Sequence, residues 1–149
     1  MQVPDFKLAT TLNRDIKLTD YAGQNIVLYF YPKDNTPGCT VEAQDFTASM
    51  SKFSKANTVI LGVSRDSLAK HIKFKAKHCM PFELISDPES QLCEYFNVIK
   101  DKSLFGVSYK GIERSTFLIN AKGEVVKEWR KVKVRGHVDE VLSAVQELC

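Results

Sequence analysis

The residues best suited to chemistry lie in one short segment, Thr36-Pro37-Gly38-Cys39. Thr36 is suited to the N-cap of a helix and Pro37 to its first position, so we expect Cys39 in the first helical turn. Unpaired N–H groups and the positive end of the helix dipole favour an anion there, and the thiolate is the nucleophilic form of cysteine. The segment therefore predicts a reactive thiol rather than a buried structural one.

Ionisation alone does not make this thiol a fast catalyst. A free cysteine is only about 3% thiolate at neutral pH, so full ionisation increases the reactive population roughly 30-fold. The accompanying fall in intrinsic nucleophilicity takes back roughly 10- to 18-fold of that gain. Further help must come from the Thr36 hydroxyl and the N–H groups of Gly38 and Cys39. These groups suit a small substrate with two adjacent oxygens, of which one is attacked and the other leaves as an anion.

Two elements must position this segment. The apolar run Ile26–Tyr31 predicts a buried strand, and Pro32 ends it. After Cys39 the apolar spacing changes to three and four residues, which predicts a helix running on to Phe53. Its buried face is expected to consist of Ala43, Phe46, Met50 and Phe53.

The remaining chain alternates between predicted strands and helices. Before the site, residues 5–20 suggest two short strands around a turn at Asn13-Arg14-Asp15. After it we expect a strand at Thr58–Val63, a helix at Ser67–His78 with Leu68, Ile72 and Ala76 inward, a strand at Phe82–Ser86, a helix holding Cys93, a loop at Lys100–Lys110, a hairpin of Ser115–Ile119 and Val125–Trp129, and a helix at His137–Leu148. This order argues for an α/β fold, with a central mixed sheet flanked by helices on both faces.

Composition narrows the class of protein. The 149 residues fit one domain covering residues 1–149. A net charge of +3 is too small to indicate a nucleic-acid partner, and the strip Lys131-x-Lys133-x-Arg135 is more simply an exposed strand edge. We find no leader and no apolar run near the roughly 20 residues that cross a bilayer. We therefore expect a cytoplasmic protein without a membrane partner, whose four cysteines are thiols in a reducing compartment.

The pattern Pro32-x-x-x-Thr36-x-x-Cys39 resembles the active-site motif of the peroxiredoxins. The longer stretch from Tyr29 to Thr40 is similar to the bacterioferritin comigratory protein branch, also called peroxiredoxin Q. Further matching blocks are Pro4-x-Phe6-x-Leu8, Leu18-Thr19-Asp20, Gly62-Val63-Ser64, Ser86-Asp87 and Gly111-Ile112-x-Arg114-x-Thr116-Phe117-Leu118-Ile119.

This resemblance implies a fold and an activity. The fold would be thioredoxin-like with the peroxiredoxin N-terminal hairpin. The activity would be thiol-dependent reduction of hydrogen peroxide and organic hydroperoxides through a sulfenic acid on Cys39, without metal, haem or flavin. The resemblance also implies thioredoxin or glutaredoxin as reductant, and a monomer or weak homodimer.

The resemblance also assigns roles to single residues. Pro32 would shield the thiol from water, and Arg114 would stabilise both the thiolate and the departing oxygen. Glu42 lies one helical turn after Cys39, where it either orients Arg114 or Lys33 or is simply exposed.

The sequence does not decide which thiol resolves the sulfenic acid. Many members of the branch carry it five residues after the nucleophile, where this chain has Gln44. Cys79, at the end of the Ser67–His78 helix, is the nearest alternative, although a link to Cys39 would require local unwinding. Cys93 is expected to be buried, and Cys149 is terminal and could pair between chains or with a small thiol. A one-cysteine mechanism with an external thiol is equally open.

Three other functions fit the sequence less well. A metal site at His71, His78 and Cys79 lacks any known cysteine spacing. A disulfide oxidoreductase would need a CxxC pair, but residues 36 and 42 are Thr36 and Glu42. A peroxide sensor or holdase could use the same Cys39 without fast turnover, and sequence does not exclude it.

Overall fold

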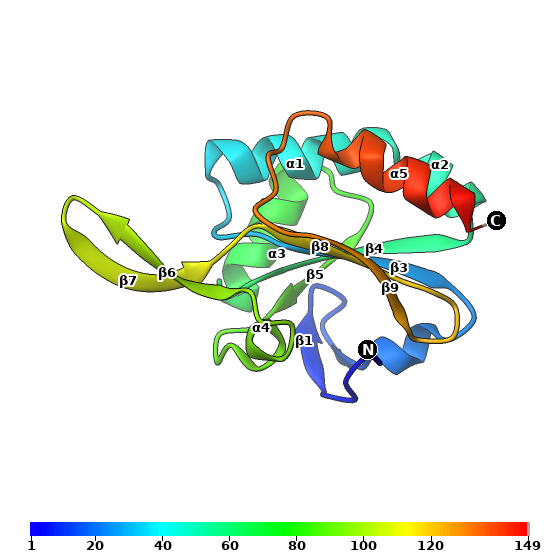
Figure 1. Ribbon diagram of the computed structural model, residues 1–149, viewed down its shortest axis with the longest axis horizontal. Helices are drawn as coiled ribbons and strands as arrows, with labels where there is room; N and C mark the ends of the chain where they lie inside the picture. Colours follow the sequence, from blue (N-terminus) through cyan, green and yellow to red (C-terminus); the bar gives the residue numbers. More distant parts are fainter. Residues whose placement is uncertain (149) are drawn as a thin grey trace.

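The fold of residues 1–148 is described by a computed structural model. Within these residues seven strands form one mixed sheet in the order β2-β1-β5-β4-β3-β8-β9, while β6 and β7 pair only with each other (Figure 1). The strands are β1 (Leu8–Thr10), β2 (Asp15–Ile16), β3 (Asn25–Phe30), β4 (Thr58–Ser64), β5 (Glu83–Ser86), β6 (Ile99–Leu104), β7 (Val107–Ile112), β8 (Ser115–Ile119) and β9 (Val125–Trp129).

The central strand β3 separates two hydrophobic cores. It pairs in parallel with β4 and antiparallel with β8, and all six of its residues are buried. Because successive side chains of a strand point to opposite faces, Val27 and Tyr29 enter one core and Ile26 and Leu28 the other. This explains why the segment reads as a continuous apolar run.

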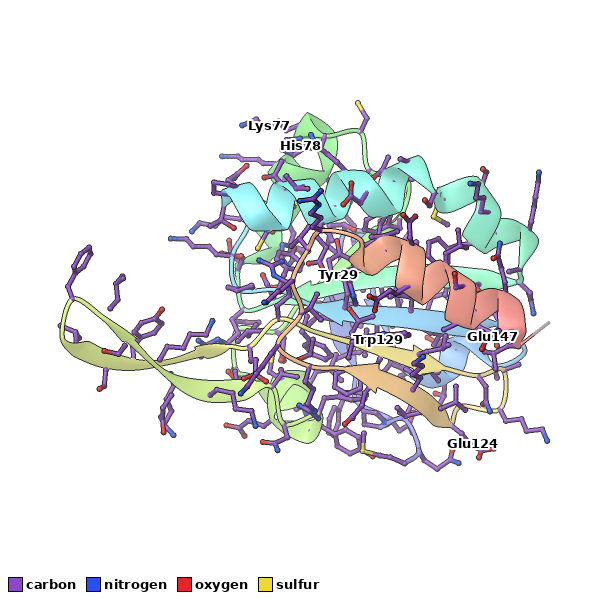
Figure 2. All side chains as sticks on the ribbon, turned by 45° about the horizontal axis from the view of Figure 1, so that its top comes forward. Tyr29, Lys77, His78, Glu124, Trp129 and Glu147 are labelled. Atoms are coloured by element: carbon purple, nitrogen blue, oxygen red, sulfur yellow. The ribbon has the colours of Figure 1, made fainter. Side chains whose placement is uncertain are left out.

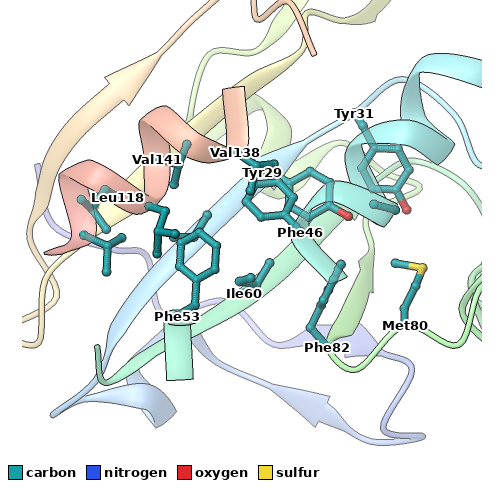
Figure 3. Packing of buried hydrophobic residues seen from close by; sticks show 14 of the residues in the cluster. Tyr29, Tyr31, Phe46, Phe53, Ile60, Met80, Phe82, Leu118, Val138 and Val141 are labelled. Carbon is teal, nitrogen blue, oxygen red and sulfur yellow. The ribbon is translucent and has the colours of Figure 1, made fainter. Parts of the chain in front are cut away.

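Helices cover both faces of the sheet, as predicted. Residues of α1 (Pro37–Ala48), α2 (Met50–Lys55), α3 (Leu68–Lys77) and α5 (His137–Glu147) contribute to the first core, which Figure 3 shows around Tyr29 and Phe46. The short helices η1 (Leu18–Tyr21) and α4 (Gln91–Tyr95) contribute to the second. The predicted N-terminal hairpin is also present, since β1 pairs with β2 and β5 at one edge of the sheet. None of the helices in residues 1–148 is both long and apolar enough to cross a membrane.

The helix predicted to run on to Phe53 is divided in two. α1 ends at Ala48 and α2 begins at Met50, with Ser49 between them at φ −102° and ψ 5°. The predicted buried face is nevertheless correct: Ala43, Phe46 and Phe53 lie in the first core, and the partly buried Met50 packs against it.

The predicted inward face of α3 is wrong. His71 and Phe74 are buried, whereas Ile72 is 40% exposed. A histidine is accepted in the core because both of its ring nitrogens have hydrogen-bond partners there. Helix periodicity does not reveal such partners, because they lie far away in the sequence.

The segment Lys100–Lys110 is a hairpin of β6 and β7, not the predicted loop. Its two turn residues, Phe105 and Gly106, both have positive φ, as a two-residue hairpin turn of this kind requires. The strands were missed because the hairpin projects away from the sheet and, beyond its base at Ile99 and Ile112, neither of its faces is buried in a core (Figures 1 and 2). Without a buried face, a strand shows no alternation of apolar and polar residues.

Candidate active site

Cys39 lies in the first turn of α1, where the sequence placed it. Thr36 occupies the N-cap position with extended backbone, and its carbonyl accepts the first helical hydrogen bond from the Thr40 N–H at 2.9 Å. Within the described chain, no acceptor takes the N–H groups of Gly38 and Cys39. Cys39 itself is only 2% exposed. A shielded thiol at a helix N-terminus is therefore surrounded by free donors.

Arg114 lies between β7 and β8, and its side chain reaches the Cys39 thiol. Its Nη2 lies 3.3 Å from the Cys39 Sγ, and its Nη1 donates to the Glu42 Oε1 at 2.7 Å. The guanidinium passes directly over Gly38, where an added Cβ would lie 3.1 Å from Nη2. A side chain at residue 38 would therefore meet the guanidinium in a tight contact, and Arg114 would have to move by a few tenths of an ångström from its place beside the sulfur.

Glu42 is fully buried and contacts Arg114 rather than Lys33. Burial raises the pKa of Glu42 from its ordinary 4.5 to about 7, although the charge and hydrogen bond of Arg114 act in the opposite direction. Burial also opposes the charge of Arg114, but Glu42 and Cys39 together raise the pKa of Arg114. The second oxygen of Glu42, Oε2, has no hydrogen-bond partner in the described chain.

Thr36 occupies the predicted N-cap position, but its side chain makes no capping hydrogen bond. Its Oγ1 instead donates to the carbonyl oxygen of Lys33 at 2.8 Å. The hydroxyl proton is therefore engaged, which leaves the oxygen lone pairs to accept a hydrogen bond from a substrate. Pro32 ends β3 as expected, and its own ring is exposed.

Together these groups match the needs of a substrate with an O–O bond. Thr36 can accept the O–H proton of a hydroperoxide, and the Arg114 guanidinium can donate to its oxygens. A thiolate at Cys39 would then attack one oxygen while the donors stabilise the charge developing on the other.

Sequence reasoning missed two groups near the site. Lys102 comes from β6, and burial together with the charge of Arg114 lowers its pKa. His137, at the start of α5, lies 2.7 Å from the Thr116 hydroxyl. Burial, followed by the charge of Arg114, lowers the pKa of His137 to about 4, so that it is neutral at neutral pH. The first was hidden in a supposed loop, and the second depends on contacts between distant strands and helices.

The other cysteines differ sharply from Cys39. Cys79 is exposed just after α3, and its backbone has a positive φ of 50°. Cys93 is buried as predicted, and burial together with a hydrogen bond to Asp87 raises the pKa of its thiol. Gln44 is exposed, and Cys149 lies outside the described residues. Within the described chain, Cys39 is therefore the cysteine thiol that lies against an arginine.

Replacing Glu42 by glutamine should flatten the pH dependence of stability. Between its ordinary pKa and the raised value of about 7, the folded protein holds a proton that the unfolded chain has released. The stabilisation from Glu42 is thus complete below pH 4.5 and is lost as the pH rises through 7. We expect the free energy of unfolding of wild type to fall, relative to Glu42→Gln, by roughly 3 kcal/mol between about pH 5 and about pH 8.

Urea unfolding of both proteins at the two pH values measures this difference. The lowered pKa of His137 acts in the opposite sense on acidification, since its stabilisation is lost as the pH falls from 6.5 through about 4. Both proteins share this contribution, so it cancels in the comparison. Parallel pH profiles would contradict the buried, titrating Glu42.

Known proteins are similar to this chain over nearly its whole length. Residues 1–128 match the AhpC/TSA family. Peroxiredoxin Bcp of Bacillus subtilis (strain 168) is 53% identical over 147 residues, which covers 99% of this chain and 94% of the relative. A solved structure of Xanthomonas campestris peroxiredoxin Q superposes with a TM-score of 0.93 at 48% identity, covering 99% of this chain and 96% of that one.

A second Xanthomonas campestris structure is of a bacterioferritin comigratory protein described for its alkyl peroxide reduction activity. It superposes with a TM-score of 0.93 at 47% identity and covers 99% of this chain and 96% of its own. The superpositions confirm the predicted thioredoxin-like fold with helices on both faces of a mixed sheet.

Proposed function

This chain belongs to the AhpC/TSA family, in its peroxiredoxin Bcp branch, and is a thiol peroxidase; from that premise we propose how the Cys39 site works and how it is recycled. Cys39 is the peroxidatic nucleophile, Thr36 and the Gly38 and Cys39 amides orient the peroxide, and Arg114 stabilises the charges. The observation that carries this assignment is the position of the Arg114 guanidinium. One of its nitrogens contacts the Cys39 Sγ, and the other is hydrogen-bonded to the buried Glu42.

The proposed oxidation is a single displacement. The Cys39 thiolate donates an electron pair to the terminal oxygen of a hydroperoxide, an S–O bond forms, and the O–O bond breaks. The second oxygen leaves as hydroxide or alkoxide and takes a proton from solvent, while the sulfur becomes a sulfenic acid. Arg114, 3.3 Å from the Cys39 Sγ, would donate to the leaving oxygen during this step. Pro32, which precedes the Thr36–Cys39 segment, would limit the access of water to the Cys39 thiol.

Hydrogen peroxide and organic hydroperoxides are the proposed substrates. The alkyl peroxide reduction described for the Xanthomonas campestris relative, at 47% identity, supports the organic class. Thioredoxin or glutaredoxin is the proposed reductant, which requires a reducing compartment such as the cytoplasm, and the acting species would be a monomer or weak homodimer. Two thiols give up two electrons to the sulfenic acid, and a disulfide and water are released.

Turnover tests this proposal against the sensor or holdase alternative. The protein is mixed with excess hydrogen peroxide and a thioredoxin regenerating system, and the peroxide consumed is counted per molecule of protein. A peroxidase consumes many equivalents. Consumption that stops at one equivalent would favour a sensor and would overturn the proposed cycle.

Disulfide mapping separates the two routes of resolution. The protein is oxidised with one equivalent of peroxide and its cysteine pairs are identified by mass, with Cys93→Ser as a control because Cys93 is buried away from solvent. A Cys39–Cys79 disulfide that disappears in Cys79→Ser would establish the internal route. A sulfenic acid that persists until an external thiol is added would establish the one-cysteine route instead.

A further inference from the structure

A buried polar cluster lies beneath the segment that carries Thr36 and Cys39. Asp34, between Pro32 and Thr36, is 4% exposed and directs its side chain inward to His71 of α3, which has no exposed surface. The Asp34 Oδ2 lies 2.7 Å from the His71 Nδ1, and the Tyr31 hydroxyl donates to the Asp34 Oδ1 at 2.6 Å. Neither the proposed oxidation nor the recycling uses these groups.

The hydrogen bonds fix where most of the protons lie. The His71 Nε2 is 2.9 Å from the backbone carbonyl oxygen of Ile85, which can only accept, so Nε2 carries a proton. The hydrogen bond between Nδ1 and the Asp34 Oδ2 then contains a second proton. Both carboxyl oxygens of Asp34 and both ring nitrogens of His71 are therefore satisfied, as polar groups in a protein core must be.

A second set of hydrogen bonds ties the Asp34 backbone to the end of β4. The Asp34 N–H donates to the Asp66 Oδ2 at 2.8 Å, and the Ser64 hydroxyl donates to the same oxygen at 2.8 Å. Asp34 is thus held at its side chain by Tyr31 and by His71 of α3, and at its main chain by the turn after β4.

The cluster is not arranged to bind a cation. One ligand atom from each of Asp34, Asp66 and His71 lies within 4.8 Å of the others. However, the short contact between Asp34 and His71 is a hydrogen bond, and the other ring nitrogen faces Ile85. The Asp66 Oδ2 already accepts two hydrogen bonds. The geometry therefore indicates a closed structural tie rather than an open coordination site.

The neighbours of Asp34 show that its hydrogen bonds hold the loop from Pro32 to Asn35 in position. Pro32, Lys33 and Asn35 are all exposed, and Asn35 has a positive φ of 63°. From Pro32 to Asn35, Asp34 is consequently the residue that is anchored in the core. Two residues later comes the Thr36 hydroxyl, and five residues later the Cys39 sulfur.

We propose that Asp34 and His71 are positioning residues for the peroxide reaction, holding the loop so that Thr36 and Cys39 face Arg114 at the distances that oxidation requires. This inference rests on the proposed function. A positioning role differs from a merely structural one because loss of Asp34 or His71 should slow the oxidation of Cys39 by peroxide more than its alkylation. Attack on peroxide needs the thiolate, the aligned donors and the acceptor, whereas alkylation by iodoacetamide needs the thiolate and enough room to reach it but not the aligned groups.

The test compares these two reactions in the same variants. Single-turnover oxidation by hydrogen peroxide and alkylation by iodoacetamide are followed by mass for wild type, Asp34→Ala, His71→Phe and Asp34→Asn. We expect Asp34→Ala and His71→Phe to slow oxidation at least about 10-fold while alkylation changes less than about 3-fold. Because an asparagine at 34 can accept from the Tyr31 hydroxyl and donate to the His71 Nδ1, Asp34→Asn should keep oxidation within about 3-fold of wild type.

Two further variants keep the test decisive. Val98→Ala leaves a cavity in the second core, on the other face of the sheet. It therefore lowers the stability of the protein without changing the loop, and both rates should stay at the wild-type value. Should Asp34→Ala fail to fold, Tyr31→Phe removes one hydrogen bond from Asp34 at nearly constant volume and should slow oxidation about 3- to 10-fold.

The outcomes distinguish two failures. Wild type that does not react with peroxide would overturn the proposed function. Reactive wild type together with folded Asp34→Ala or Tyr31→Phe at the wild-type oxidation rate would overturn only the positioning role. Equal slowing of oxidation and alkylation would also overturn it, because the loop would then control access rather than alignment.

Discussion

Cys39→Ser loses peroxide turnover down to the background rate of the thiol reductant. A serine hydroxyl stays protonated at neutral pH in this position and cannot displace oxygen from a peroxide as a thiolate does. The fold should survive, since the change is nearly isosteric and the first core gains only one small polar group. The measurement is peroxide consumption in a thioredoxin-coupled assay, with unfolding by urea recorded in parallel.

The matched control for Cys39→Ser is the same substitution at another buried cysteine. Cys93 has no exposed surface, and the serine hydroxyl can take over its hydrogen bond to Asp87. Cys93→Ser should therefore retain the wild-type rate. Residual turnover in Cys39→Ser would mean that another thiol carries the reaction, and the assignment of the nucleophile would then be wrong.

Arg114→Ala should slow the oxidation of Cys39 by at least about 10-fold, and by up to the roughly 10²- to 10³-fold that is lost when one donor to a developing oxyanion is removed. The reason lies in the two contacts of the guanidinium. One nitrogen faces the Cys39 Sγ at 3.3 Å and the other holds Glu42 at 2.7 Å. Stopped-flow or quenched-flow oxidation under single-turnover conditions measures the rate of this step directly.

Two variants separate charge from geometry at this position. Arg114→Lys keeps the positive charge but lacks the fork that reaches Cys39 and Glu42 at once, so its rate should lie between wild type and Arg114→Ala. Arg114→Ala also leaves Glu42 buried without its partner, and the double variant with Glu42→Gln removes that penalty. If the double variant regained stability but not rate, the loss would be catalytic rather than a consequence of unfolding.

An exposed arginine is the control for the charge itself. Arg135 makes no ion pair within residues 1–148, and its removal changes the net charge by the same amount as Arg114→Ala. Arg135→Ala should leave the oxidation rate unchanged. Wild-type speed in Arg114→Ala would show that its guanidinium does not take part in the reaction.

Local patterns predicted much of the site. The apolar run before Pro32, the Thr36-Pro37 start of α1 and the family resemblance together placed Cys39 in the first helical turn. The resemblance also brought Arg114, 75 residues away, to the same place, and the two side chains are indeed in contact. Each of these inferences depended on short-range sequence signals or on a recognised motif.

The parts that were missed depend on contacts between distant residues. Asp34 and His71 are 37 residues apart, and neither lies in a pattern that indicates its partner. The outward position of Ile72 follows from the same contact, since a satisfied histidine occupies the core instead. Glu42 was left between exposure and two alternative partners, because only the folded chain shows that Arg114 covers it.

The hairpin of β6 and β7 carries an aromatic ring almost fully into water, since Phe105 is 96% exposed and Leu104 and Val107 beside it are also exposed. A solvated apolar tip lowers solubility and favours self-association as concentration rises. We expect the apparent molecular mass to depend on dilution, independently of the thiol. The assembly state of this protein is therefore best measured across a concentration series, with a Phe105→Ser sample alongside.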